Sequence, residues 1–337
     1  MCEKDPKVSV IIVNFRGLER LEKCLKSLER TKYPNFDIIV VDCLTDNIEA
    51  WLRERFPNVK LIHYDYDIGA SASHNVDRRF LDPKTKYLAF LDNDVYVTEN
   101  WLTELVKVLE NNKEIGVAQA KILIARKPSL LDHAGLAIDA LGTWHTSYGS
   151  KAGLLENVLE LFAASSAGCI VRRDVFEEVG GFDPDYYIYD DDTDFSFRVR
   201  LLGYKVVLVP SAIVLHDSEP TRFLKPKKLY HSVKNRICTM LKNYEIKNLW
   251  WRLIAYIISA LLAGFGLALM GKVEESKEII RGLIYPLTNA RKIWMKRALI
   301  QSRRKIRDSG LIRKGLLRRD PLPTIFDIKS KLSYLRG

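Results

Sequence analysis

The chain has 337 residues, of which 47% are hydrophobic and 28% charged. This balance excludes a disordered or fibrous protein and predicts a folded one with one large or two ordinary cores. Its five cysteines are odd in number and lack CxxC spacing, so neither a disulfide framework nor a zinc site is indicated, and a reducing cytosolic compartment fits best. The first ten residues enter a strand-like run, and we expect no signal peptide.

The net charge of +11 is unevenly distributed. Up to Glu219, acidic residues outnumber Lys and Arg by 35 to 26, whereas from Pro220 onward Lys and Arg outnumber acidic residues by 27 to 7. We therefore expect an acidic domain over residues 1–220 and a basic region over residues 221–337. The basic region lacks a nucleic-acid-reading motif and surrounds an apolar run, 253–271, that has no charge. A membrane surface explains both features, so we expect lipids and no nucleic acid as its partner.

Short β-branched runs alternate with longer amphipathic stretches over the first 120 residues. The run at 8–13 is typical of a buried strand, and 18–30 places its apolar residues on one helical stripe. Further strands are predicted over residues 37–42, 58–63, 86–91 and 115–120, separated by helices over residues 45–56, 69–81 and 98–112. This βαβα order predicts an α/β protein with a doubly wound, mostly parallel sheet, whose ligands bind at the carboxyl ends of the strands.

The periodicity weakens over residues 122–160, which we interpret as functional loops covering a cleft, because long structureless stretches are otherwise uncommon within a domain. Regularity then returns. We predict a strand over residues 168–171, a helix from Arg173, a helix over residues 191–202 and two strands, over residues 205–209 and 212–216.

Polar residues gather where the predicted strands end. Asn14 follows the first strand, Asp42 the second, and Asp92, Asn93 and Asp94 the fourth. Two carboxylates two positions apart at a strand end can both turn toward one hard cation, which takes oxygen ligands and would neutralise a diphosphate. A solvated turn or a helix cap is the alternative. No GxGxxG follows the first strand and no P-loop is present, so neither a dinucleotide fold nor a P-loop enzyme is indicated.

A second acidic cluster, residues 190–194, opens the predicted helix that follows a run of aromatic residues at 186–189. Helix capping would explain one of its carboxylates. Crowded carboxylates beside aromatic side chains are also where one pKa rises and a general base can arise.

In this order the motifs resemble those of the inverting glycosyltransferases of family 2, which have a GT-A fold. The resemblance extends from about Lys7 to Asp217 and rests on VSVIIVNF, IIVVDCLTD, DIGASASHN, YLAFLDNDV and GCIVRRDVFEEVGGFDPDYYIYDDDTDFSFRVRLLGYKVVLVPSAIVLH. It implies transfer of a sugar from a nucleotide-diphosphate donor with inversion, aided by Mg²⁺ or Mn²⁺. The basic and apolar tail resembles, more weakly, that of the rhamnosyltransferase-like branch.

The resemblance also implies roles for single residues. Those implied to bind the nucleotide sugar are Asn14, Asp42, Gly69, Asn75, Asp92 and Asn93. Asp92 and Asp94 would be the DxD pair at the metal, and His216 would complete the metal site. Asp192 aligns with the general base that deprotonates the acceptor hydroxyl. Since the family usually has Glu-Asp where this chain has Asp191 and Asp192, the choice of base between these two stays open.

The apolar run 253–271 is just long enough to cross a hydrocarbon layer of ~30 Å. Trp250 and Trp251 lie at one end and basic residues at both, as at membrane interfaces. A second apolar stretch, 279–287, is followed by RKIWMKR and suits a helix in the headgroup plane. A single span, a shallow hairpin, an interfacial helix pair and a soluble subdomain buried in an oligomer all remain open.

We favour membrane association, because basic clusters beside an apolar helix attract anionic lipid. The catalytic domain is then expected at the cytoplasmic face of the cell membrane, where nucleotide sugars are made, with a lipid-linked or cell-surface glycan as acceptor.

Two other functions fit parts of these patterns. A sugar nucleotidyltransferase would also use a DxD pair at a strand end, but it would not need the second acidic cluster. A non-catalytic, membrane-bound nucleotide-binding scaffold is the third possibility.

Overall fold

The computed structural model describes residues 5–217 and 225–320. The chain divides into two compact units. The first comprises residues 1–134, 147–199 and 204–220, and the second comprises residues 135–146, 200–203 and 221–337.

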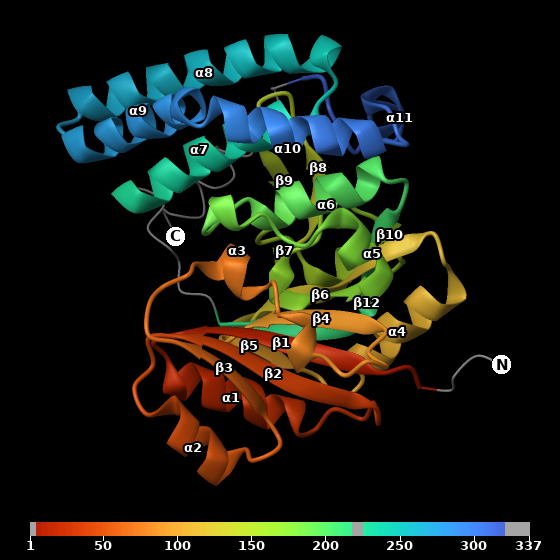
Figure 1. Cartoon of the computed structure of the whole chain (residues 1–337). Helices are drawn as coiled ribbons and strands as arrows, with labels where there is room; N and C mark the ends of the chain where they lie inside the picture. The colour runs from red at the N-terminus through yellow and green to blue at the C-terminus, as the bar shows by residue number, and fades with distance from the viewer. Residues whose placement is uncertain (1–4, 218–224, 321–337) are drawn as a thin grey trace. The chain divides into compact units, whose positions relative to one another are not determined.

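The first unit is built on a mixed sheet of ten strands within the described residues (Figure 1). Along the main path the order is β10-β12-β6-β11-β4-β1-β2-β3, while β5 pairs with β12 and β7 with β6. The strands are β1 (Val8–Phe15), β2 (Phe36–Cys43), β3 (Lys60–Tyr64), β4 (Tyr87–Asp92), β5 (Val95–Val97), β6 (Ile115–Ile124), β7 (Lys127–His133), β10 (Leu159–Glu160), β11 (Cys169–Arg172) and β12 (Lys205–His216).

The strands that carry the candidate site are parallel. β1 pairs in parallel with β2 and with β4, so that Asn14 lies opposite Asp42 and Val13 lies opposite Asp92. Parallel strands point their carboxyl ends to one edge, and the polar residues that end them therefore meet there. The predicted α/β sheet is confirmed, with β11 inserted antiparallel between β4 and β6.

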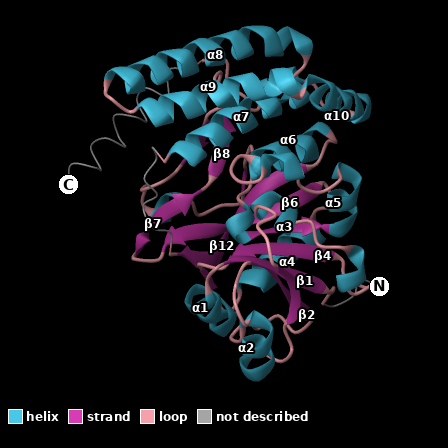
Figure 2. Ribbon diagram, turned by 60° about the vertical axis from the view of Figure 1, so that its left-hand side comes forward, coloured by secondary structure: helices cyan, strands magenta, loops and turns pink. Residues whose placement is uncertain are grey.

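Helices cover both faces of this sheet. α1 (Leu18–Leu28), α2 (Ile48–Arg55) and α4 (Trp101–Asn111) share one apolar core with one face of the strands. α3 (Ala70–Ser73), α5 (Arg173–Val179) and α6 (Asp191–Leu201) lie on the other face (Figures 1 and 2). There Phe90 of β4 packs against Phe176 of α5 and against Phe182, and the Phe182 ring stacks on Phe195 of α6 at 4.6 Å.

The structure differs from three of the sequence predictions. The helix predicted over residues 69–81 is limited to α3 and the 3₁₀ turn η1 (Arg78–Phe80). Serines and an asparagine compete for backbone hydrogen bonds here, and Ser73 donates its hydroxyl to the Gly69 carbonyl at 2.9 Å. The strands predicted over residues 205–209 and 212–216 form one strand, β12, whose register shift between Val209 and Ile213 accommodates the intervening proline.

The third difference concerns residues 122–160, for which the sequence predicts loops. They contain β7, β10, the 3₁₀ turn η2 (Ala152–Leu154) and a hairpin of β8 (Gly135–Ile138) and β9 (Trp144–Thr146). β8, β9 and β10 have only four, three and two residues and are separated by segments that contain glycine, which leaves too few consecutive residues for a recognisable period.

The second unit, as far as the structure describes it, contains five helices and the β8–β9 hairpin (Figure 2). The helices are α7 (Pro226–Asn243), α8 (Ile246–Leu269), α9 (Val273–Thr288), α10 (Ala290–Arg303) and α11 (Asp308–Arg313). α9 packs against both α7 and α8. Gly282 permits the first of these contacts, because a Cβ there would lie only 2.9 Å from the Val233 Cβ.

Candidate active site

A hydrogen-bonded group of polar side chains joins the ends of β1, β2 and β4. The Asn14 amide donates to Asp42 Oδ1 at 2.5 Å, and its Oδ1 accepts a hydrogen bond from Asn93 Nδ2 at 2.6 Å. Thr45 donates its hydroxyl to Asp42 Oδ1 at 2.6 Å, and His63 Nδ1 lies 2.8 Å from Asp42 Oδ2. Three predicted site residues, Asn14, Asp42 and Asn93, are thus brought together.

Asp42 is fully buried, and both of its carboxylate oxygens have partners. Its predicted contact with the base or ribose stays a prediction. Thr45 and His63 were missed by the sequence reasoning. His63 lies directly opposite Asp42 on the neighbouring strand, so the strand register is a signal that could have identified it.

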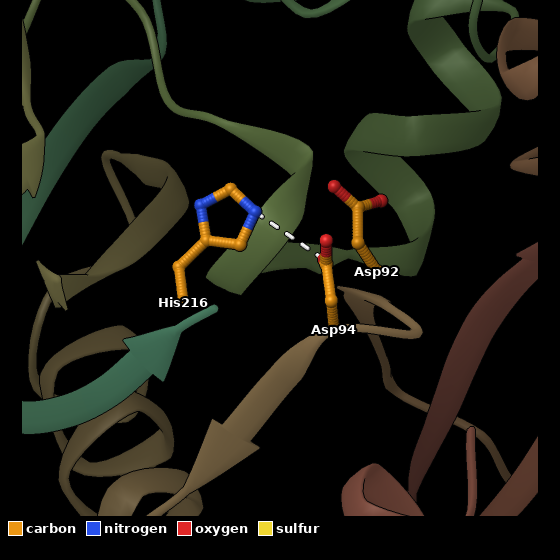
Figure 3. A group of neighbouring side chains, drawn as sticks. All are labelled: Asp92, Asp94 and His216. Carbon is orange, nitrogen blue, oxygen red and sulfur yellow. Dashed lines mark ion pairs between the residues drawn. The ribbon is translucent and has the colours of Figure 1, made fainter. Parts of the chain in front are cut away.

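Asp92, Asp94 and His216 lie together at the same edge, and we call them the metal-ligand cluster. Asp92 ends β4, Asp94 lies in the turn to β5, and His216 ends β12 beside β5. One ligand atom from each of the three lies within 4.8 Å of the others. Figure 3 shows the His216 ring directed at Asp94, with Nε2 3.3 Å from Asp94 Oδ1. The structure therefore groups all three residues that were predicted to hold a metal.

A further carboxylate orients His216. Its Nδ1 lies 2.6 Å from Oδ2 of Asp132, on β7. Burial lowers the pKa of His216, but its hydrogen bonds to Asp132 and Asp94 outweigh this effect and raise the pKa to about 10. Asp132 was missed, because the sequence around β7 shows no periodicity that would place it beside β12.

The two carboxylates of the cluster have opposite pKa shifts. Burial raises the pKa of Asp92, and the negative charge of Asp94 adds to this rise. Burial also acts to raise the pKa of Asp94, but the His216 hydrogen bond and the positive charges of His216 and Arg20 lower it overall. Arg20 of α1 lies 3.5 Å from Asp94 Oδ2. The positive charges of His216 and Arg20 thus offset the repulsion between the carboxylates of Asp92 and Asp94.

This donor set fits a divalent cation. Two carboxylates and an imidazole converge, and the Asp132 carboxylate fixes the orientation of the imidazole, as in many protein metal sites. A divalent cation would also relieve the unfavourable ionisation of the partly buried Asp92.

The second acidic cluster begins α6 and follows a loop with unusual backbone geometry. Tyr187, Tyr189 and Asp190 have φ values of 65°, 67° and 57°. Non-glycine residues seldom adopt positive φ, and such conformations concentrate at functional sites where the surrounding structure holds them. The loop places Asp191 and Asp192 at the start of the helix.

Asp192 has the most perturbed environment of the cluster. Burial raises its pKa well above the ordinary value, and the charges of Asp191, Asp190 and Asp92 add to the rise. Asp92 belongs to the metal-ligand cluster, so charges of both clusters act on the Asp192 carboxylate. A carboxylate with a raised pKa is a stronger base than an ordinary one.

The other acids of the cluster have different surroundings. Asp194 is fully buried and pairs with Arg198 at 2.8 Å, one turn along α6, so it has a structural partner. Asp191 Oδ2 lies 3.7 Å from Nδ1 of His74. The buried His74 ring packs against Phe90 and Phe182, and neither of its nitrogens has a hydrogen-bond partner. His74 was missed by the sequence reasoning, although it lies inside the quoted motif DIGASASHN.

Gly69 and Asn75 connect the α3 segment to this part of the site. Gly69 has a φ of 80°, and a Cβ there would lie 2.7 Å from the Tyr187 carbonyl oxygen. The Asn75 amide donates to the Phe182 carbonyl at 2.8 Å and accepts from the Phe182 N–H at 2.8 Å. Both residues therefore hold the segment that precedes α6. Their predicted contact with the nucleotide sugar stays a prediction.

Comparison with known proteins gives the family. The chain is 28% identical over 231 residues to the O-antigen biosynthesis protein RfbC of Myxococcus xanthus, a match that covers 64% of this chain and 18% of that protein. It is 24% identical over 263 residues to the glycosyltransferase AglE of Haloferax volcanii, covering 75% and 82%. It is 35% identical over 110 residues to an N-acetylglucosaminyl-diphospho-decaprenol L-rhamnosyltransferase of Mycobacterium tuberculosis, covering 32% and 34%.

The chain spans only a small part of some of these relatives. It matches less than a fifth of the RfbC protein and a quarter of the uncharacterized protein y4gI of Sinorhizobium fredii, to which it is 29% identical.

Solved structures show the same fold. GalNAc-T7 with UDP, GalNAc and Mn²⁺ matches with a TM-score of 0.58 and 16% identity, over 85% of this chain and 58% of that one. The mannosyltransferase PcManGT from Pyrobaculum calidifontis, in complex with GDP-Man and Mn²⁺, matches with a TM-score of 0.55 and 15% identity, over 89% and 86%. At these identities the likeness shows the GT-A fold alone.

A family model described as glycosyltransferase like family 2 matches residues 6–238, which is well over half of the chain and includes both acidic clusters. The chain therefore belongs to glycosyltransferase family 2.

Proposed function

We propose that the chain moves a sugar from a nucleotide-diphosphate donor to a lipid-linked or cell-surface glycan, with inversion at the anomeric carbon. The observation that carries this proposal is the convergence of two acidic groups. Asp92, Asp94 and His216 form a site suited to a divalent cation. Asp191, next to Asp192, lies 3.7 Å from His74, whose ring packs on Phe90 of β4, the strand that Asp92 ends.

The donor would bind at the sheet edge, with Asn14, Asp42 and Asn93 at its nucleoside and Gly69 and Asn75 shaping the adjoining wall. The hydrogen bonds that join Asn14 to Asp42 and Asn93 support this, because they orient the three side chains before a ligand arrives.

Asp92, Asp94 and His216 would hold Mg²⁺ or Mn²⁺, which when bound would neutralise the charge that develops on the departing diphosphate. The solved structures of GalNAc-T7 and PcManGT contain Mn²⁺, which supports a divalent cation without deciding between the two ions.

Asp192 would act as the general base, with Asp191 as the alternative. The carboxylate of the base would accept the proton of an acceptor hydroxyl, and the hydroxyl oxygen would then attack the anomeric carbon on the face opposite the diphosphate. The bond between the anomeric carbon and the diphosphate oxygen breaks, and the nucleoside diphosphate leaves with that electron pair. A single displacement of this kind inverts the anomeric centre.

The acceptor and the location follow from relatives and from the C-terminal region. One relative is named a rhamnosyltransferase that acts on a decaprenol-linked sugar, which supports a lipid-linked acceptor and a rhamnosyltransferase-like role. The catalytic domain would comprise residues 1–220 and the membrane-associating region residues 221–337, at the cytoplasmic face of the cell membrane. α8 is apolar and long enough to reach a membrane interior.

The experiment is a screen of UDP-, GDP- and dTDP-sugars for slow hydrolysis by detergent-purified protein, with and without Mn²⁺. We expect metal-dependent release of one nucleotide, lost in Asp94→Ala. In Asp192→Asn we expect donor binding to persist and transfer to fall by about 10²–10⁴-fold, the usual contribution of a general base.

The control is Asp190→Asn. It changes a neighbouring acid in the same way, and asparagine tolerates the positive φ of 57° at this position. Transfer in this control should stay within a few-fold of the unmodified protein. Equal loss of transfer in the two variants would contradict the assignment of Asp192. Nucleotide release that does not depend on metal would contradict the role of the cluster around Asp94.

A further inference from the structure

One face of α8 is apolar and exposed along the whole helix. Its large side chains there are between 52% and 73% exposed, and they are Trp250, Ile254, Ile258, Leu262, Phe265 and Leu269. They recur every three or four positions and so lie on one side of the helix. Six exposed large side chains on one face far exceed the scattered apolar residues of an ordinary soluble surface. We call this surface the α8 face.

The opposite side of α8 is held by polar contacts within the same unit. Arg252 is fully buried and donates to the carbonyls of Asp139, at 3.2 Å, and Arg318, at 2.6 Å. Asn248 donates to Asp308 Oδ2 at 2.9 Å. These contacts fix which side of the helix is covered and which side is left open.

α9 lies beside α8 and is charged over its first half. Gly264 of α8 meets α9 closely, because a Cβ there would lie 3.6 Å from Ile279 and 3.7 Å from Ser276. Figures 1 and 2 both show the two helices side by side. Around this contact α9 carries the ion pairs Lys277–Glu274 and Arg281–Glu278. If α8 crossed a bilayer with this packing kept, it would carry these charges into hydrocarbon, which is costly.

The composition of the second unit suits an anionic lipid surface. Residues from Pro220 onward carry 27 basic against 7 acidic side chains, and Arg291 and Lys292 at the start of α10 are exposed. Two exposed tryptophans, Trp250 at 61% and Trp294 at 62%, have the amphipathic rings that concentrate at membrane interfaces. Apolar helix faces combined with basic residues are typical of helices that lie in the headgroup plane.

We propose that the α8 face lies in one leaflet of an anionic bilayer, with α8 parallel to the membrane plane, and that α8 does not cross the membrane. This inference rests on the membrane association in the proposed function and specifies its geometry. It chooses the interfacial helix pair among the arrangements that the sequence left open.

The first test is flotation of the full chain with vesicles of phosphatidylcholine alone and with phosphatidylglycerol added. We expect binding to the anionic vesicles, weakened at least about tenfold by Leu262→Glu, because a leucine that enters the leaflet is replaced by a charge. The matched control is Leu154→Glu in the first unit, since Leu154 is 70% exposed and Leu262 66%. Equal effects of the two changes would overturn the proposal.

The second test measures depth by spin labels at Ile254→Cys, Leu262→Cys and Leu269→Cys in a Cys2→Ser background, since Cys24, Cys43, Cys169 and Cys238 are buried. A helix in the membrane plane places all three labels at a similar depth, about 5–10 Å below the surface. A spanning helix would place the label at position 262 about 12 Å deeper than that at 254, from the rise of eight residues. That result would overturn the proposal.

The proposal would also be overturned if the chain bound no vesicle and instead formed a stable dimer that protected the labels on α8. In that case a second copy of the chain would cover the α8 face. Metal-dependent hydrolysis of the nucleotide sugar, measured on the same samples, reports on the proposed activity separately. If the unmodified chain fails to bind anionic vesicles while its hydrolysis is intact, the membrane geometry is refuted and the transferase proposal stands.

Discussion

Gly69→Ala is a direct test of how the α3 segment supports the second acidic cluster. Gly69 has φ 80° and ψ 153°, a region open essentially only to glycine. A Cβ there would lie 2.5 Å from Tyr187 Cδ2 and 2.7 Å from its carbonyl oxygen. The conformational cost is about 1–3 kcal/mol, and overpacking adds about 1–3 kcal/mol. We expect a loss of about 2–6 kcal/mol, a large part of the stability of an ordinary domain.

Two other glycines separate these two causes. Gly180 has a φ of 87° but nothing within 4 Å of a Cβ, so Gly180→Ala should cost only the conformational part, about 1–2 kcal/mol. Gly153 has neither the positive φ nor the contact, and Gly153→Ala should stay within about 0.5 kcal/mol of the unmodified protein.

The assay is urea unfolding followed by circular dichroism, with transfer activity measured on the same samples. If the protein relieves the contact by moving Tyr187, Gly69→Ala loses activity more than stability, because the same loop leads into Asp191 and Asp192. A Gly69→Ala variant that matches Gly180→Ala in both stability and activity would refute the close packing of Gly69 on Tyr187.

Three further predictions concern single side chains of the site. Because the pKa of Asp192 is raised in the folded protein, its ionisation destabilises the fold fully above that pKa and not at all below the unfolded pKa. Asp192→Asn should therefore raise the melting temperature at neutral pH, and this gain should disappear in acid. In the unmodified protein, kcat/KM should fall on acidification at a higher pH than it would with an ordinary aspartate. A melting difference independent of pH would contradict this. Asp132→Asn should weaken Mn²⁺ binding by about 10–100-fold in calorimetry, because it loosens the orientation of His216, and unchanged affinity would count against the metal site. His74→Phe should keep the ring packing and the melting temperature but lower kcat, since it removes the partner of Asp191; an unchanged kcat would make His74 a packing residue only.

The sequence predicted those features of the fold that depend on local periodicity. β1, β2 and β4 and the helices α1 and α4 are present where alternation and helical stripes indicated them, and their parallel order brought Asn14, Asp42 and Asp92 to one edge. It failed where pairing partners decide the structure. Residues 70–73 form only one turn of helix, in which the Ser73 hydroxyl bonds to the Gly69 carbonyl, and β7 is held by its pairing with β6.

The same distinction applies to the candidate site. Residues in motifs, such as Asp94 and His216, could be named from the sequence because their positions at strand ends are local features. Asp132 and His63 lie in no such motif, since each acts through a residue on another strand, and His63 becomes identifiable only once the register of β2 and β3 is known. Among the four acids at 190–194, the resemblance singled out Asp192, with Asp191 as the alternative, but the different partners of these acids could not be read from the sequence.

The environments of these acids argue against helix capping as a sufficient explanation of the cluster. Asp194, with its buried partner Arg198, stabilises α6 in the ordinary way. A cap alone would not require three positive φ values before the helix, or a partly buried carboxylate whose ionisation is opposed by three neighbouring negative charges. Both features cost stability, and unfavourable local features of this kind are retained mainly where function requires them. The raised pKa that makes Asp192 unfavourable for folding also makes it an effective base, so one arrangement accounts for both the cost and the proposed chemistry.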